Sequence, residues 1–376
     1  MTGAPSPTTL RQHDWVPRGG PEQRLRSWTP LGADTLGLGR VLGPPATDGE
    51  VVVAAWSPGG PDVGVAAREL AALVGGWLRD HPDDGTRLVL VTRGPVLARV
   101  GDSPVHTGAW GVLRCALAAH PGRFAMADVD GSPESLLAMC RAVAAGEPEL
   151  AVRGGRVFVP RLVPAAGSAS PTSEDVVLVV GAVDGAGGVL ARHLAARPRT
   201  GRVVQCAADA RGELDDLART VPLTAVVVAA ADPAHLWAVH ERTRALGLSR
   251  FVVLSTAAGV TGAPGAYRRA AAGAYADAVV RHRRAEGHAG TSLAWGPWAG
   301  CRPRPDPAER EWWSRLGVAQ LSTIQGLRVF DEVWDSDGAV LVPLTGPTGS
   351  TPEADLPAAM RDRLPVGDLG RGGPRG

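Results

Sequence analysis

Short apolar runs alternate with longer helical patterns along most of the chain, and this alternation constrains the fold more than any other feature. In the first half the apolar runs span 50–56, 87–93 and 123–129, each bounded by Gly, Pro or Asp. Runs of this kind are typical of buried strands. Helical patterns over 63–80 and 106–120 separate them. The alternation predicts an α/β fold with a mostly parallel sheet.

The second half of the chain repeats the pattern. Strands are expected at 176–181, 202–206, 223–230, 250–256, 291–295 and 339–343. Helices are expected at 187–197, 212–220, 235–246 and roughly 268–286. This order predicts a doubly wound sheet. A hairpin over 149–163, turning on Gly154 and Gly155, is expected to close the first half.

Two stretches of small and polar residues suggest where the units end. The segment PAAGSASPTSED, residues 164–175, separates the two α/β patterns. The sequence after Thr345 is rich in Gly and Pro, as a linker would be. We therefore divide the chain into units at 10–165 and 174–345 and a flexible tail or linker at 346–376.

Composition excludes several classes of function. The formal net charge is +1, which gives no electrostatic footprint for nucleic acid. No apolar run approaches the roughly 20 residues of a membrane helix, and the N-terminus lacks a signal-peptide core, so a cytoplasmic protein without a membrane partner is expected. All 39 basic residues are arginines, so no mechanism that needs a lysine amine can operate.

Neither the cysteines nor the histidines form a recognisable metal motif. The four cysteines (Cys115, Cys140, Cys206, Cys301) are widely spaced and are expected to be reduced, buried thiols. His282 and His288 lie in the basic stretch RHRRAEGH, which we interpret as a solvated helix face. No metal site is predicted.

A glycine-rich turn follows the first strand of the second half. Gly181, Gly185 and Gly187 stand between that strand and a helix, which is the context of a pyrophosphate-binding turn. The alternative is a glycine turn kept for packing alone. Asp184 favours the alternative, because a carboxylate inside a phosphate cradle repels the anion.

Motifs spread over roughly residues 12–345 resemble the ketoreductase region of modular type I polyketide synthases, within the short-chain dehydrogenase/reductase superfamily. They are HDWVP, RLVLVTRG, HTGAWGVLRCALAAHPGRF, ELAVRGGRVFVPRLV, VLARHLAA, LTAVVVAAA, RFVVLSTAAGVTG, GAYADAVVRHRRAEG, TSLAWGPWAG and LSTIQGL. The resemblance implies two Rossmann-like units. The first half is a truncated structural subdomain without cofactor, and the second is the catalytic subdomain, shortened. NADPH is the implied cofactor. The implied partners are other synthase domains and an acyl carrier protein.

Active members of this family use a serine, a tyrosine, a lysine and an asparagine. Carried onto this sequence, the serine position is Thr256, the tyrosine position is Arg269 and the asparagine position is Gly273. Tyr275 is the packing tyrosine of the family's AY-x-D signature. Tyr267 is out of register by two residues, roughly 200° around the helix.

Two shortenings accompany these substitutions. The match breaks off after Ala231 and resumes at Leu236, so the family's lysine-bearing helix is missing. One strand, 202–206, stands where the family has two strands and a helix, and the lost segment normally carries the arginine for the NADPH 2′-phosphate. Arg211 is a candidate to replace that arginine.

The sequence therefore predicts a degenerate, redox-inactive ketoreductase domain that acts as a structural spacer. A residual reductase or α-epimerase using Thr256, Tyr267 and Arg269 is one alternative. A module that binds NADP(H) without turnover is the other. Trp312 and Trp313 are expected either to cover the pocket as a lid or simply to pack, and Trp295 and Trp298 either to line the substrate side or to belong to the core.

Overall fold

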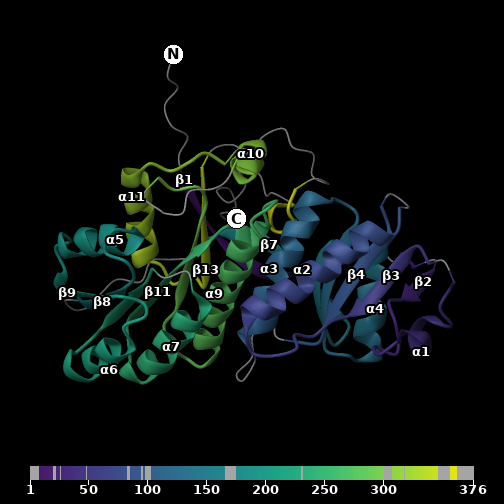
Figure 1. Ribbon diagram of the computed structural model, residues 1–376, viewed down its shortest axis with the longest axis horizontal. Helices are drawn as coiled ribbons and strands as arrows, with labels where there is room; N and C mark the ends of the chain where they lie inside the picture. The colour runs from purple at the N-terminus through teal and green to yellow at the C-terminus, as the bar shows by residue number, and fades with distance from the viewer. Residues whose placement is uncertain are drawn as a thin grey trace, which may run out of the picture.

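The computed structural model (Figure 1) describes most of the 376 residues. The described residues are 8–19, 23–25, 27–47, 49–82, 85–94, 96–97, 103–165, 175–229, 232–299, 307–316, 318–345 and 356–361. Cys301 and the segment 346–355 lie outside them.

Thirteen strands of this described part form a single sheet, in the order β2-β3-β4-β5-β6-β7-β1-β13-β12-β11-β10-β8-β9. The strands of the first half are β1 (Thr8–Arg18), β2 (Trp28–Pro30), β3 (Val51–Ala55), β4 (Arg87–Thr92), β5 (Phe124–Val129), β6 (Glu149–Arg153) and β7 (Arg156–Pro164). Those of the second half are β8 (Asp175–Val180), β9 (Thr200–Cys206), β10 (Ala225–Val228), β11 (Arg250–Thr256), β12 (Thr291–Trp295) and β13 (Val340–Thr345).

Helices cover the sheet along its length (Figure 1). In the first half they are α1 (Leu38–Leu42), α2 (Val63–Asp80), α3 (Pro104–Ala119) and α4 (Pro133–Ala144). In the second half they are α5 (Ala186–Ala195), α6 (Arg211–Thr220), α7 (Pro233–Thr243), α8 (Ala258–Thr261), α9 (Tyr267–Ala285), α10 (Pro307–Arg315) and α11 (Thr323–Trp334). The expected α/β fold with two Rossmann-like units is confirmed. None of these helices has the length and apolar content to cross a bilayer.

Local sequence explains where several elements begin and turn. Asp62 starts α2 by accepting a hydrogen bond from Val65 N at 2.9 Å, as an N-cap residue does. The hairpin of β6 and β7 turns on Gly154 and Gly155, whose φ angles of 52° and 73° lie in the left-handed region. Two successive positive φ angles form the tight turn that suits the twist of paired strands, so the expected hairpin is confirmed.

The second half has the shortened order that the sequence suggests. One strand, β9, and one helix, α6, connect α5 to β10, and β9 pairs with β8 at the end of the sheet. Parallel pairing then runs from β8 through β10, β11 and β12 to β13. The carboxyl ends of these parallel strands meet at one edge, where ligands bind in doubly wound folds.

Strand β1 joins the two halves and was not expected from the sequence. It pairs antiparallel with β7 on one side, Trp15 opposite Pro160, and with β13 on the other, Arg11 opposite Val342. Its eleven residues, TTLRQHDWVPR, are polar at most positions and only partly buried. The strand therefore lacks the apolar run on which strand prediction depends.

Part of the expected flexible tail packs against the protein. Residues 356–361 include a short 3-10 helix, Ala358–Met360, whose side chains are buried. Arg161 Nη1 of β7 donates a hydrogen bond to Ala358 O at 3.2 Å. The expectation of a flexible tail therefore does not hold for this segment, because Leu356, Ala359 and Met360 add apolar surface to a core cluster.

The two halves are held together by closely packed helices. A Cβ atom built on Gly111 of α3 would lie 2.2 Å from Ala270 O of α9, so the backbones touch there. Beside this contact, Arg114 of α3 forms a buried ion pair with Glu149 at 2.6 Å and donates to Gly259 O of α8 at 2.5 Å. Helix α9 of the second half thus packs closely against α3 of the first half.

Candidate functional site

The carboxyl end of β11 presents the two hydroxyl residues of the expected site. Ser255 Oγ donates a hydrogen bond to Gly273 O of α9 at 3.1 Å. Thr256 Oγ1, at the serine position, accepts one from Ala258 N at 3.3 Å. Both hydroxyls therefore serve the local backbone, and the Thr256 hydroxyl hydrogen remains available as a donor.

The asparagine position, Gly273, has no room for a side chain because neighbouring atoms pack closely around it. A Cβ atom on Gly273 would lie 2.5 Å from Thr256 Cγ2, 3.1 Å from Thr256 O and 3.3 Å from Ser255 Oγ. A Cβ on Gly259 of α8 would similarly lie 2.6 Å from Ala274 N. Helices α8 and α9 and strand β11 thus meet so closely that an asparagine side chain cannot enter unless the Thr256 side chain or one of these elements shifts.

The tyrosine position holds a paired cation. Arg269 lies one helical turn before Gly273 on α9 and forms an ion pair with Glu309 of α10. The Glu309 side chain is only 4% exposed, and its other oxygen accepts from Trp313 Nε1 at 3.4 Å. A guanidinium is no general acid at neutral pH, so this position cannot deliver a proton to an oxyanion.

Helix α10 packs down on the elements of the site. Trp312 Nε1 donates to Gly262 O at 3.1 Å, and both Trp312 and Trp313 are buried. They join the core cluster that includes Ala257, Ala258 and Ala270. Of the two expectations for this tryptophan pair, packing describes what they do here. Trp295 and Trp298 are likewise buried, with their rings stacked 4.7 Å apart.

Neither tyrosine of the chain is activated. Burial raises the pKa of Tyr275 to about 12, and a Cβ on Gly108 of α3 would lie 3.1 Å from its Cβ. Tyr267 is half-buried, and burial, followed by the neighbouring Cys115 thiol, raises its pKa. A phenol that acts as general acid near neutral pH needs the opposite shift, which a nearby lysine cation supplies in this type of chemistry.

Amide groups of the glycine turn donate hydrogen bonds within the turn itself. Gly185 N and Gly188 N both donate to Ala182 O, at 3.3 and 3.1 Å. A Cβ on Gly188 would lie 1.7 Å from Val183 O, and Gly181 adopts φ 154° beside Ala229. Close packing therefore explains Gly181, Gly187 and Gly188, whereas a Cβ on Gly185 would make only ordinary contacts of 3.7 Å.

The residues at this edge do not fit NADPH well. Two of the amide groups that would cradle a pyrophosphate are occupied, and the exposed Asp184 adds like charge. Arg211 is exposed at the start of α6, a helix that follows β9 at the same edge. It offers one cation to a 2′-phosphate. No lysine exists in the chain to hold the nicotinamide ribose.

Sequence reasoning missed the buried partner of Arg269. Glu309 lies in the segment PAEREWWSR, where nothing distinguishes it from the exposed Glu311 two residues later. Only the fold, which turns this face of α10 toward α9, marks it as a site residue. The interpretation of His282 as part of a solvated face is wrong, because its side chain is buried against Trp237 and His240.

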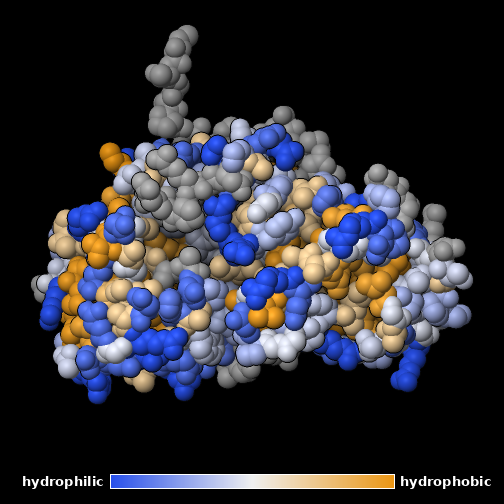
Figure 2. All heavy atoms as spheres, viewed as in Figure 1, coloured by the Kyte–Doolittle hydropathy of each residue, from blue (hydrophilic) through white to orange (hydrophobic). Residues whose placement is uncertain are grey.

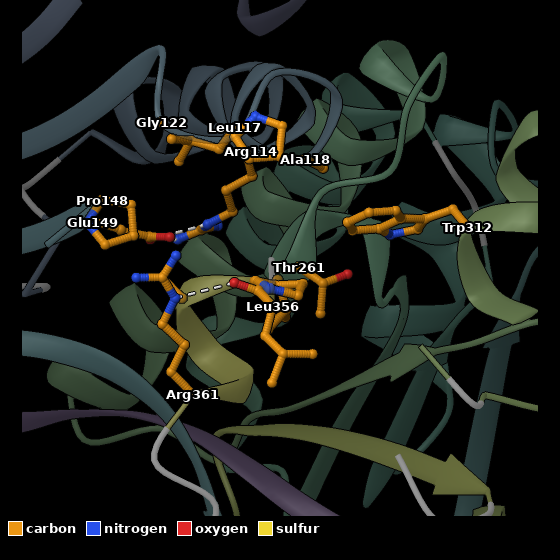
Figure 3. Close-up of a pocket in the computed structure, with 14 residues that line it drawn as sticks. Arg114, Leu117, Ala118, Gly122, Pro148, Glu149, Thr261, Trp312, Leu356 and Arg361 are labelled. Atoms are coloured by element: carbon orange, nitrogen blue, oxygen red, sulfur yellow. Dashed lines mark hydrogen bonds and ion pairs between the residues drawn. The ribbon is translucent and has the colours of Figure 1, made fainter. Parts of the chain in front are cut away.

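A small cavity lies next to the site, between α3 and α8 (Figure 3). Its volume is about 40 Å³, and its lining includes Arg114, Glu149, Trp312 and residues of the segment 356–361. Arg361 Nε donates to Leu356 O at 3.1 Å across its rim. This volume suits one or two water molecules and not an organic substrate.

Comparisons with known proteins agree with this architecture. Residues 13–162 match the family model for the Rossmann fold domain of the polyketide synthase extender module SpnB, and residues 203–300 match the KR domain model. Polyketide synthase GfsE of Streptomyces halstedii is 32% identical over 89% of this chain, and GfsB of the same organism is 34% identical over 88%. The chain spans only 11% and 7% of the lengths of these relatives.

Solved structures show the same fold. The first ketoreductase of the tylosin polyketide synthase superposes with a TM-score of 0.72 at 22% identity, covering 95% of this chain and 97% of that one. A structure described as A-type ketoreductases from a modular polyketide synthase gives 0.71 at 24% identity, with coverages of 95% and 98%. Both halves of the fold, the two family models and the relatives thus point to one conclusion: the chain belongs to the ketoreductase domains of modular polyketide synthases, built on the short-chain dehydrogenase/reductase fold.

Proposed function

We propose that this ketoreductase-type domain is redox-inactive and serves as a structural spacer in its synthase. It would occupy the ketoreductase position of a module and leave the β-keto group of the passing intermediate unreduced. Its partners would then be the neighbouring synthase domains and the acyl carrier protein that presents the intermediate.

The ion pair between Arg269 and Glu309 carries the proposal. Carbonyl reduction needs a proton for the new alkoxide as well as a hydride. At the position of the proton donor this chain has a guanidinium neutralised by a nearly buried carboxylate. Loss of general acid–base catalysis alone lowers a rate by about 10²–10⁴-fold. Loss of the lysine, which would also hold the cofactor, adds to that deficit.

A rigid inert domain is supported by how the site is filled. Glycine contacts close the asparagine position, and Trp312 fastens α10 over α8. These contacts fill the space around positions 256 and 273 with packed side chains and backbone. Such packing suits a domain selected for its shape and its contacts more than for turnover.

Two other functions would use the same edge. A rearranged reductase or α-epimerase would rely on the free hydrogen of Thr256 with Tyr267 or Arg269. A nucleotide-binding module would rely on the turn at Gly181, Gly185 and Gly187 with Arg211. The occupied amides at Gly185 and Gly188 argue against strong binding.

Incubation with NADPH and a β-ketoacyl thioester tests the proposal. We expect no consumption of NADPH above the rate without protein, measured by the absorbance of the reduced nicotinamide, and no reduced product by mass spectrometry. A ketoreductase domain with all four family residues serves as the positive control. Sustained turnover that Thr256→Val or Tyr267→Phe abolishes would refute the proposal and establish a rearranged enzyme.

Calorimetry with NADPH separates the binding module from the spacer. The spacer predicts no heat of binding at millimolar nucleotide. Saturable binding that Arg211→Gln weakens, without turnover, would instead support the nucleotide-binding function.

A further inference from the structure

Helices α7 and α9 bring two histidines and a glutamate together at the opposite end of α9 from Arg269 and Gly273. His282 and Glu286 are one turn apart at the end of α9, so they share a face. His240 lies in the last turn of α7, which packs against α9. His282 Nε2 is 3.5 Å from Glu286 Oε1, and His240 Nε2 is 3.8 Å from Glu286 Oε2.

We propose that His240, His282 and Glu286 form a binding site for a zinc ion that ties α7 to α9. One ligand atom from each of the three lies within 4.8 Å of the others. A tetrahedral zinc with bonds of about 2 Å holds its ligand atoms roughly 3.3 Å apart, so small side-chain rotations suffice. Two imidazoles and one carboxylate are a common set of zinc ligands.

Unpaired polar atoms inside the protein give an independent reason. The His240 side chain is fully buried, yet its Nε2 has no hydrogen-bond partner among the described residues. The same holds for Glu286 Oε2, 3.8 Å away. Buried polar atoms without partners are costly, and a shared cation would satisfy both at once.

The surroundings also suit a metal. Trp237 lies against both imidazoles, with ring centroids 4.9 and 5.6 Å away, and supplies the apolar wall that metal sites usually have. Burial, followed by the charge of Arg283, lowers the pKa of His240 to about 4, so this imidazole is neutral, as a ligand must be. Glu241 Oε1, 3.8 Å from His240 Nε2, or a water can complete the coordination.

One contact limits the affinity. Arg283 Nη1 lies 3.3 Å from His240 Nδ1, so without metal it donates to that atom and the ring proton is on Nε2. Metal binding moves the ring proton to Nδ1 and breaks this hydrogen bond. Arg283 keeps its bond from Nε to Ala289 O at 2.8 Å. Because of this exchange and the nearby positive charge, we expect micromolar rather than nanomolar affinity.

Metal titration of the untagged chain, after treatment with a chelator, tests the site. We expect one Zn²⁺ per chain by calorimetry, and the intense visible absorption of tetrahedral Co²⁺ when cobalt replaces zinc. Glu286→Gln, a change at a partly exposed carboxylate that should fold normally, should weaken binding by more than about 100-fold, since loss of even an outer-shell partner costs 10–100-fold. His282→Gln should do the same.

His235→Gln is the matched control, because it removes a histidine of the same helix α7 outside the cluster. It should leave the stoichiometry and the affinity unchanged. The proposal would be overturned if no Zn²⁺ binds at about 100-fold molar excess. That excess is on the order of a millimolar, well above the expected dissociation constant. Binding that Glu286→Gln and His282→Gln leave intact would overturn it as well. Neither result depends on whether the domain reduces ketones.

Discussion

The substitution Gly273→Ala probes whether the asparagine position has closed. A Cβ there would lie 2.5 Å from Thr256 Cγ2, whereas carbon atoms in ordinary contact are about 3.5–4.0 Å apart. Overpacking of this kind costs about 1–3 kcal/mol. Replacing a helical glycine with alanine returns roughly 1 kcal/mol. The expected net effect is a loss of up to about 2 kcal/mol in the free energy of unfolding.

The clash can be relieved from the other side. Thr256→Ser removes Cγ2 but keeps the hydroxyl, so the contacts that remain are 3.1 Å to the carbonyl of residue 256 and 3.3 Å to Ser255 Oγ. In the Thr256→Ser background, Gly273→Ala should be neutral or stabilising. A double-mutant cycle by urea unfolding should therefore give a coupling free energy of about 1–2 kcal/mol.

Gly76→Ala in α2 is the matched control for this cycle. Its added Cβ would meet only a flexible arginine end, Arg79 Nη2 at 3.9 Å, so it should stabilise the protein by roughly 1 kcal/mol. The reasoning is refuted if Gly273→Ala stabilises as much as Gly76→Ala. It is refuted equally if the two changes at 256 and 273 add within about 0.5 kcal/mol.

Three further predictions follow from the same structure. Arg269→Gln should lower the free energy of unfolding by about 1–3 kcal/mol in urea, because it removes a paired cation from beside the buried Glu309 carboxylate. Adding Glu309→Gln should recover most of this loss, and Arg268→Gln, at an exposed neighbour, should have no effect. The pKa of His240 is about 4 in the folded state and about 6.5 in the unfolded chain, so between these pH values the unfolded chain binds the extra proton. The free energy of unfolding should therefore fall by up to about 2 kcal/mol as the pH drops from 6.5 to 5. His240→Gln should remove this slope when both proteins are measured with a chelator present. Burial raises the pKa of Cys115 and Cys140 to about 12 and of Cys206 to about 11. Peptide mapping should therefore find these thiols unreactive toward iodoacetamide at pH 8 until urea unfolds the chain. Labelling of the native protein at the rate of free thiols would contradict their burial.

Apolar periodicity predicted the buried parallel strands and the long helices because those elements carry their own signal. Examples are the apolar run VVLVV of β8 and the helical spacing of the apolar residues in α2. Strand β1 carries no such signal. Its backbone is recruited by the free edges of β7 and β13, and those edges exist only once both halves have formed.

For the candidate site, the sequence predicted the positions of the residues but not their surroundings. The family's AY-x-D signature placed the asparagine position at Gly273 and the tyrosine position at Arg269, and both lie on α9, one turn apart. What the signature could not supply is the environment of each residue: the carboxylate from α10 beside Arg269, or the burial of His282, which a basic stretch of sequence disguised. These depend on tertiary contacts between residues tens of positions apart.

The surface is less informative than these buried contacts. Figure 2 shows hydrophilic and hydrophobic residues interspersed over this face of the molecule. Among the large apolar residues described, Val183 and Ile324 are the most exposed, at 69% and 67%. They come from the glycine turn and the start of α11, and scattered exposure of this kind needs no functional explanation.

The position of β1 has a consequence for biosynthesis. This strand leaves the ribosome before its partners, yet it pairs with β7 about 150 residues later and with β13 more than 300 residues later. During translation β1 can pair with β7 once the first half has been made, but its other edge stays unpaired until β13 has been made. The central seam of the sheet therefore closes last, and the interval before closure is when this chain is most exposed to aggregation and to chaperones.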